Sequence, residues 1–197
     1  MNFLQVIEQR RSINPLDATY LQPKEELIAS LQSILTYTPS SFNKQTQRMV
    51  LLLEHSHQQF WDLVIYAIQR IVPVEQFERS KAKISLFRNS LGTVLFFDDT
   101  YATKALGNQF PLYQDSVETW SVEQNGMLQI NVWNGLVSLG YQANLQHYTE
   151  LIEEQTKEAF LIPSHWKMMG QMPFGVAKIA PNPKEYIPLV NRFLVRD

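Results

Sequence analysis

The order of apolar and polar positions along the chain predicts both helices and strands. Apolar residues at helical spacing predict helices over residues 3–9, 23–37, 58–70, 117–139 and 150–160, with a more polar helix after residue 73. Three shorter runs predict strands over residues 49–53, 92–99 and 173–180. The continuous apolar run at 49–53 is typical of a strand buried on both faces. These elements together predict an α+β fold around one central sheet.

The chain shows no internal boundary. No repeat, low-complexity tract or linker-like stretch interrupts the predicted elements, so residues 1–197 are predicted to form a single domain. A chain of this length that is 45% hydrophobic can bury one sizeable core. The tail from Pro188 mixes apolar residues with two arginines, and we expect it to dock, with a partner subunit as one place for it.

Composition excludes several classes of function. The 17 Lys and Arg residues nearly balance the 19 Asp and Glu residues, so no broad field would attract nucleic acid or an anionic membrane surface. The absence of cysteine excludes disulfides, thiolate metal sites and cysteine nucleophiles, and leaves redox chemistry to a cofactor. No glycine-rich nucleotide motif is present. Because neither a signal peptide nor a membrane-length apolar stretch is visible, we expect a cytoplasmic protein.

Two polar strings at predicted helix ends could bind a ligand. Arg10, Arg11 and Ser12 offer forked guanidinium donors and a hydroxyl, which suit a phosphate group. Residues 39–45 offer hydroxyls, amides and backbone groups that could hydrogen-bond the edge of a planar heteroaromatic ring. Taken singly, a solvated basic loop and an ordinary turn are the commoner readings. The occurrence of both strings in one chain favours the ligand.

Other polar and aromatic residues are assigned no role in a site. His55 and His57 form a pair without a third ligand, so we expect ordinary surface histidines and no metal. Asp98 and Asp99 leave a predicted strand in opposite directions, so we expect a turn or a helix cap rather than a catalytic pair. Four aromatic residues are assigned to the core or to a dimer interface: Phe110, Tyr113, Trp120 and Trp133.

The order and spacing of the two strings resemble the nitroreductase superfamily, whose members open with a helix, an Arg-x-Ser loop, a second helix and a Pro-Ser-Ser-x-Asn-x-Gln loop. The chain is most similar to the small fatty-acid-repression branch. The segments that carry this closer similarity are Gly92–Phe97, the helix bearing Trp133, Asn144–Tyr148, Met172–Gly175 and Asn191–Phe193. The resemblance covers nearly the whole chain. It implies a three-layer fold, with a mixed central sheet flanked by helices, and an intertwined homodimer that shares two FMN sites.

The resemblance also implies which residues bind FMN. The phosphate and ribityl chain would lie near Arg10 to Ser12 and a C-terminal arginine, and the ring between residues 39–45 of the partner subunit and residues 145–147. Asn14 stands where many larger relatives have a lysine, and a neutral amide stabilises an anionic reduced flavin less. The implied cofactor-binding residues are Arg10, Arg11, Ser12, Asn14, Pro39, Ser40, Ser41, Asn43, Gln45, Leu145, Gln146, His147 and Arg192. His147 could contact the flavin or be a packed neutral histidine.

The implied activity is that of an FMN-dependent oxidoreductase. NADH or NADPH would reduce the flavin, leave, and be replaced by a nitroaromatic or quinone, which is ping-pong chemistry. Because the flavin carries the electrons, no catalytic side chain is expected. One alternative is a flavin-binding regulatory or sensor protein with little turnover. A more distant one is a helical interaction protein in which both strings are only turns.

Overall fold

A five-stranded sheet forms the middle layer of the protein, and the computed structural model describes residues 1–196. The strands are β1 (Leu16–Asp17), β2 (Gln47–Leu53), β3 (Gly92–Asp99), β4 (Gln142–Ala143) and β5 (Trp166–Ala177). Their order is β1-β5-β3-β2, and β4 also pairs with β5. All the described ladders are antiparallel, and one parallel bridge joins Ser12 to Ala143, so the sheet is mixed only at that bridge.

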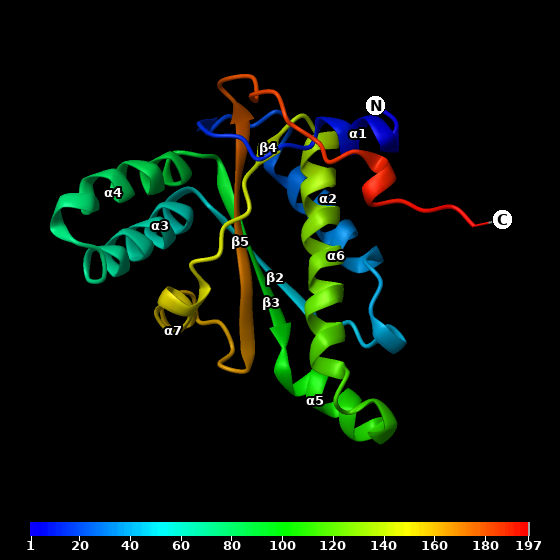
Figure 1. The fold of residues 1–197 in the computed structure, drawn as a ribbon. Helices are drawn as coiled ribbons and strands as arrows, with labels where there is room; N and C mark the ends of the chain where they lie inside the picture. The colour runs from blue at the N-terminus through cyan, green and yellow to red at the C-terminus, as the bar shows by residue number, and fades with distance from the viewer. Residues whose placement is uncertain (197) are drawn as a thin grey trace.

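Helices cover both faces of the sheet, which confirms the three-layer α+β prediction (Figure 1). The helices are α1 (Phe3–Gln9), α2 (Lys24–Tyr37), α3 (Glu54–Gln69), α4 (Val74–Arg88), α5 (Thr100–Gln109), α6 (Val117–Ser138) and α7 (Thr149–Phe160). Helices α1, α2 and α6 pack on one face, and α3, α4 and α7 pack on the other. None of the helices within residues 1–196 combines the length and hydrophobicity that crossing a membrane requires.

Strand β3 belongs to both hydrophobic cores. All of its residues are buried, and successive side chains point to opposite faces of the sheet. Val94 and Phe96 pack with α6, whereas Leu95 and Phe97 pack with α3. The apolar run at residues 94–97 of β3 therefore reflects a central strand covered by helices on both sides.

Strand β2 differs from the prediction. Its residues are mostly half-buried, because β2 lies at the edge of the sheet and pairs only with β3. Both faces of β2 contact a hydrophobic core, as expected, but the strand is less deeply buried than the prediction implies. The sequence of β2 is apolar because its side chains reach both cores. One edge of the strand pairs with β3, and the other has no neighbouring strand within residues 1–196.

Two further elements differ from the sequence-based expectation. Strand β5 begins at Trp166 rather than near residue 173, and it ends at Ala177. Gly170 and Pro173 obscure its periodicity, and a register shift in its pairing with β3 places one extra residue there. Helix α5 was not predicted. The sequence of α5, TYATKALGNQ, has few apolar residues. The helix begins where the Asp99 side chain caps its first turn.

Candidate functional site

The arginine loop (residues 10–14) and the segment 145–147 both border strand β4. The parallel bridge joins Ser12 to Ala143, and the Ile13 N–H donates to the Ala143 carbonyl at 3.2 Å. Residues 145–147 follow β4 directly, and the Gln146 N–H donates to the Gln171 carbonyl of β5 at 2.7 Å. The fold therefore brings two of the predicted cofactor-binding segments together at one edge of the sheet.

The two arginines of this loop are fixed but not neutralised. The Arg10 guanidinium lies 4.4 Å from the centre of the Trp133 ring on α6, a cation–π contact. Arg11 Nη2 donates to the Asn182 carbonyl of the C-terminal tail at 2.7 Å. No carboxylate within residues 1–196 forms an ion pair with either arginine. Both positive charges are therefore available to an anionic ligand.

Buried polar atoms without partners gather beside the arginine loop. Asn14 Oδ1 and Gln142 Oε1 flank the bridge to β4, and Trp133 Nε1 belongs to the ring that Arg10 contacts. Buried polar groups are nearly always hydrogen-bonded, because an unpaired group costs roughly 1–3 kcal/mol. This concentration of unpaired donors and acceptors fits a polar ligand with hydrogen-bonding groups of its own.

The serine loop (residues 39–45) contains the second predicted set of ligand-binding residues and has an unusual backbone. Phe42, Asn43 and Gln45 all have left-handed conformations, with φ of 52°, 53° and 50°. This conformation costs a residue other than glycine roughly 1–2 kcal/mol. Within the loop, the Gln45 N–H donates to Ser40 Oγ at 2.8 Å, and Gln45 Nε2 donates to Asn43 Oδ1 at 3.0 Å. A loop of this shape requires support from outside.

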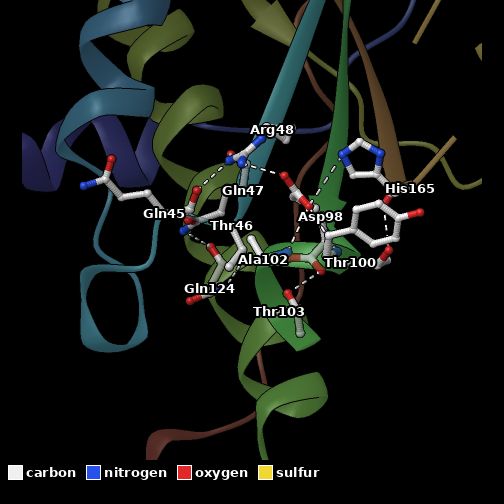
Figure 2. A network of polar contacts seen from close by, with 12 residues as sticks. Gln45, Thr46, Gln47, Arg48, Asp98, Thr100, Ala102, Thr103, Gln124 and His165 are labelled. Atoms are coloured by element: carbon white, nitrogen blue, oxygen red, sulfur yellow. Dashed lines mark hydrogen bonds and ion pairs between the residues drawn. The ribbon is translucent and has the colours of Figure 1, made fainter. Parts of the chain in front are cut away.

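Side chains of β2 and α6 supply that support, and Figure 2 shows the contact between Arg48 and Gln45. Three of them bond to the backbone of the loop: Gln47 Nε2 donates to Pro39 O at 2.9 Å, Gln124 Oε1 accepts from the Ser41 N–H at 2.9 Å, and Arg48 Nη1 donates to Gln45 O at 2.5 Å. Sequence reasoning missed all three. Each acts on the loop through a contact between distant segments, and the local pattern around none of them signals this.

Within one chain, the serine loop does not lie next to the arginine loop. The arginine loop contacts α6 at Trp133 and the serine loop contacts it at Gln124, which places the two contacts about 13 Å apart along the helix axis. Figure 1 shows the short turn of the serine loop (η1, Ser41–Asn43) well removed from α1 and the arginine loop. Arg192, in the exposed tail, makes no hydrogen bond to the arginine loop within residues 1–196.

The segment 145–147 is ordered by its own side chains. Gln146 Nε2 donates to the Leu145 carbonyl at 2.9 Å and to Asn144 Oδ1. Leu145 and Gln146 are half-buried, whereas His147 is exposed. His147 is therefore not a packed histidine in this chain. A contact between His147 and a flavin stays a prediction.

The expectation of surface histidines holds for His55 and was wrong for His57. His57 is buried, with Nε2 3.0 Å from the Arg88 carbonyl and Nδ1 2.9 Å from Thr93 Oγ1. Because a carbonyl only accepts, Nε2 donates to Arg88 and Nδ1 accepts from the Thr93 hydroxyl. Burial lowers the pKa of His57 from 6.5 to about 4. The adjacent H-x-H positions face different sides of α3, so His57 tethers α3 to α4 and β3.

The predicted helix cap is confirmed for Asp99, whereas Asp98 does not cap a helix. Asp99 Oδ1 accepts from the N–H groups of Tyr101 and Ala102 in the first turn of α5, at 3.1 and 3.0 Å, and its Oδ2 accepts from Arg48 Nη2 at 2.7 Å. Asp98 is buried and accepts from the hydroxyls of Thr46 at 2.6 Å and Thr103 at 2.7 Å. The two carboxylates therefore belong to separate hydrogen-bond systems.

The aromatic residues divide into two groups. Trp133 is buried, as predicted for a core residue. The other three surround the half-exposed ring of Phe42 in the serine loop, with ring-centre distances of 4.3 Å for Phe110, 6.1 Å for Tyr113 and 6.2 Å for Trp120. A cavity of about 360 Å³ opens beside this group. In one chain these three residues form a surface cluster instead of core, and their place in a dimer interface stays a prediction.

Known proteins resemble this chain over most or all of its length. The model of the Nitroreductase family matches residues 7–176. Nitroreductase FRM2 of Saccharomyces cerevisiae is 30% identical over 188 residues, which cover 94% of this chain and 93% of FRM2. Nitroreductase CinD from Lactococcus lactis, solved with nicotinic acid, is 33% identical, with a TM-score of 0.92 and coverage of 100% of both chains.

Two further similarities concern solved structures with other ligands. Structures of CinD with chloramphenicol and with 4-nitrophenol, both 32% identical over the full length of both chains, have TM-scores of 0.91 and 0.90. A structure from Exiguobacterium sibiricum solved with FMN has a TM-score of 0.71 over 100% of this chain and 98% of its own, at 16% identity, and supports the fold alone. Family match, sequence identity and fold agree, and the chain belongs to the nitroreductase family as an oxidoreductase of the nitroreductase type.

Proposed function

We propose that this chain is an FMN-dependent oxidoreductase that uses NADH or NADPH to reduce nitroaromatics or quinones. The observation that carries the proposal is the arginine loop of a nitroreductase-family chain, with two unneutralised arginines beside three unpaired buried polar atoms. A phosphate group suits the arginines, and a heterocycle suits the unpaired amide and indole atoms. The complexes of CinD with nicotinic acid and 4-nitrophenol support small aromatic ligands in this family.

In this proposal the residues of the chain bind and orient the cofactor. Arg10, Arg11 and Ser12 hold the phosphate, and Asn14 offers an unpaired carbonyl oxygen to a ring N–H. FMN, when bound, accepts a hydride from the nicotinamide and passes the electrons to the oxidant. Donor and oxidant would use the same open face in turn, which predicts ping-pong kinetics. Because Asn14 is neutral, it would stabilise an anionic reduced ring less than a lysine would.

We also infer that two chains form the site together. The serine loop contacts α6 about 13 Å along the helix axis from the arginine loop of its own chain, and in this proposal the partner's serine loop completes each site. Apolar side chains left exposed on α1, α2, α6 and the tail fit such an interface: Phe3, Leu4, Ile7, Tyr37, Val122, Met127, Ile130, Leu189, Val190, Phe193, Leu194 and Val195. A homodimer would cover them. The cytoplasmic location expected from the sequence is part of the same proposal.

The test is to purify the protein, record its visible absorption spectrum and identify any chromophore that heating releases. We expect a yellow protein that releases FMN and oxidises NADH or NADPH in the presence of a quinone or 4-nitrophenol. Replacing both Arg10→Ala and Ser12→Ala should weaken FMN binding by about 100-fold, because charge-assisted bonds to the phosphate are lost. Arg79→Ala, at an exposed position on α4, is the control.

Two outcomes would count against the proposal. A colourless protein that does not bind added FMN would overturn it. A protein that binds FMN but does not turn over with any of these oxidants would instead support the flavin-binding sensor.

A further inference from the structure

The serine loop is held by a chain of hydrogen bonds whose direction is fixed at one end by Asp98 (Figure 2). A carboxylate only accepts hydrogen bonds, so the Thr46 hydroxyl donates to Asp98 Oδ1, at 2.6 Å. The lone pairs of Thr46 Oγ1 then accept from Gln124 Nε2, at 2.6 Å. This fixes which end of the Gln124 amide faces Thr46 and leaves Oε1 to accept from the Ser41 N–H, at 2.9 Å.

The members of this chain are deeply buried and lie on rigid elements. Thr46 is 0% exposed, and Asp98 and Gln124 are each 3% exposed. Asp98 ends the central strand β3, and Gln124 lies within α6. The core therefore fixes the positions of Asp98 and Gln124. Asp98 orients the Gln124 amide through Thr46, and Gln124 Oε1 in turn holds the backbone of Ser41.

A second connection reaches the other end of the loop from the neighbouring carboxylate. Arg48 Nη2 donates to Asp99 Oδ2 at 2.7 Å, and Arg48 Nη1 donates to the Gln45 carbonyl at 2.5 Å. Because Asp99 is itself held by the first amides of α5, the guanidinium cannot move without breaking several bonds. Adjacent residues of one strand thus support both ends of the same loop.

These bonds act on a loop whose free hydroxyls point to a ligand-binding role. Ser40 Oγ accepts from the Gln45 N–H, which leaves its own proton available to donate. The Ser41 hydroxyl makes no hydrogen bond within residues 1–196. The loop therefore offers two hydroxyl donors on a backbone that contains three left-handed residues. Side chains of Gln124 and Arg48, outside the loop, hold this backbone in place.

We propose that Thr46, Gln124 and Arg48, set by Asp98 and Asp99, are positioning residues that pre-organise the serine loop for the flavin. This inference rests on the proposed function, in which the serine loop contacts FMN. None of these residues needs to touch the cofactor, and their effect reaches it through the backbone of residues 39–45. A pre-formed loop binds with less loss of conformational entropy than one that must order on binding.

The experiment compares Thr46→Val with Thr46→Ser. Valine keeps the shape of threonine but breaks the chain between Asp98 and Gln124, whereas serine keeps the hydroxyl. For Thr46→Val we expect FMN to dissociate about tenfold more readily, as the loss of a buried hydrogen bond predicts, and Thr46→Ser to stay within about twofold of the wild type. Amide exchange over residues 39–45 of the apoprotein should accelerate in Thr46→Val but not in Thr46→Ser, a change that a general loss of stability would not confine to this loop.

Thr156→Val is the matched control. Thr156 is fully buried in α7 on the opposite face of the sheet, and its hydroxyl makes no hydrogen bond within residues 1–196. The same substitution there should leave FMN affinity and loop exchange unchanged. If Thr46→Val does not fold, Arg48→Lys serves instead, because Arg48 is half-exposed and lysine keeps the charge beside Asp99 but cannot also span to the Gln45 carbonyl.

The outcomes separate this inference from the proposed function. If the wild-type protein does not bind FMN, the proposed function fails, and this inference fails with it. If the wild type binds FMN but Thr46→Val and Arg48→Lys bind it equally well, with unchanged exchange over residues 39–45, only the positioning role is overturned. Weaker binding together with faster loop exchange in either variant, and rescue by Thr46→Ser, supports it.

Discussion

His57 shows at the scale of one residue how burial fixes a protonation state. Its ring lies between the Thr93 hydroxyl and the Arg88 carbonyl, and Trp61 Nε1 donates to the same hydroxyl at 2.8 Å. A charged imidazolium would be penalised by its burial, and it would also have to donate from both nitrogens, so that Thr93 Oγ1 would accept from His57 and Trp61 together and the Thr93 proton would lose His57 as its acceptor. The folded protein therefore keeps His57 neutral, in agreement with its lowered pKa.

This neutral histidine predicts a loss of stability in acid. Its pKa is about 4 in the folded chain against an ordinary value of 6.5, so between these values the unfolded chain binds a proton that the folded chain does not. Stability from this group is present above pH 6.5 and falls by about 3 kcal/mol as the pH drops to about 4. Urea unfolding of the wild type and of His57→Gln over this range measures the effect. Equal pH slopes for the two proteins would contradict it.

The chemistry of single residues could be predicted from the sequence only where the function depends on residues that are adjacent in the chain. Arg10 to Ser12 stand out because adjacent guanidinium and hydroxyl groups suit a phosphate whatever the rest of the chain does. Thr46 and Gln124 could not be found in this way, since each becomes important only when β2 and α6 meet. His57 was misassigned because its neighbour His55 has the same composition around it and faces solvent.

At the scale of secondary-structure elements, the junction of β1 and β5 depends on Gly175. A Cβ atom at this position would lie 2.4 Å from the Asp17 carbonyl oxygen and 3.2 Å from the Leu91 nitrogen. Both neighbours are backbone atoms, so neither can rotate away. The short strand β1 can pair with β5 only while residue 175 has no side chain.

We therefore expect Gly175→Ala to destabilise the protein by about 1–3 kcal/mol, the range typical of overpacking. Gly107→Ala on α5 is the control. Its added methyl would meet the Val117 side chain at 3.3 Å, which can adjust, and alanine also favours the helix. Thermal unfolding of the two variants beside the wild type measures the difference. A Gly175→Ala protein as stable as the Gly107→Ala protein would show that β1 can shift without cost.

Elements with strong periodicity were predicted well, and those defined by tertiary contacts were not. Helices α1, α2 and α6 follow clear apolar stripes, and the predicted bounds agree with the structure to within one residue. Strand β5 was predicted too short because Gly170 and Pro173 lie inside it and normally mark breaks. Helix α5 was missed because it has only two buried residues larger than glycine. The position of β2 at the sheet edge depends on strand order, which periodicity does not report.

At the scale of the whole molecule, the exposed apolar residues of α6 predict how the protein responds to a surface charge. Val122, Met127 and Ile130 are 56%, 46% and 42% exposed. We expect Ile130→Glu to produce a monomer, because burying an unpaired carboxylate in an interface is strongly unfavourable. FMN should be lost with the dimer. Light scattering and the visible spectrum measure both, and Lys83→Glu on α4, on the opposite face of the sheet, is the control.

A dimeric Ile130→Glu protein that retains FMN would place the interface elsewhere. The three-layer fold itself could be predicted from sequence through the resemblance, and the structure confirms it. The single domain over residues 1–197 stays a prediction, which the sharing of β3 between both cores favours.

The separation of the arginine loop and the serine loop along α6 has a genetic consequence. In the proposed dimer, each chain gives its arginine loop to one site and its serine loop to the other. A chain with a defective arginine loop and a chain with a defective serine loop would each form dimers with no working site. In a mixed dimer, both defects fall in the same site and leave the other site intact. Two alleles that are inactive alone would therefore complement one another when expressed in the same cell.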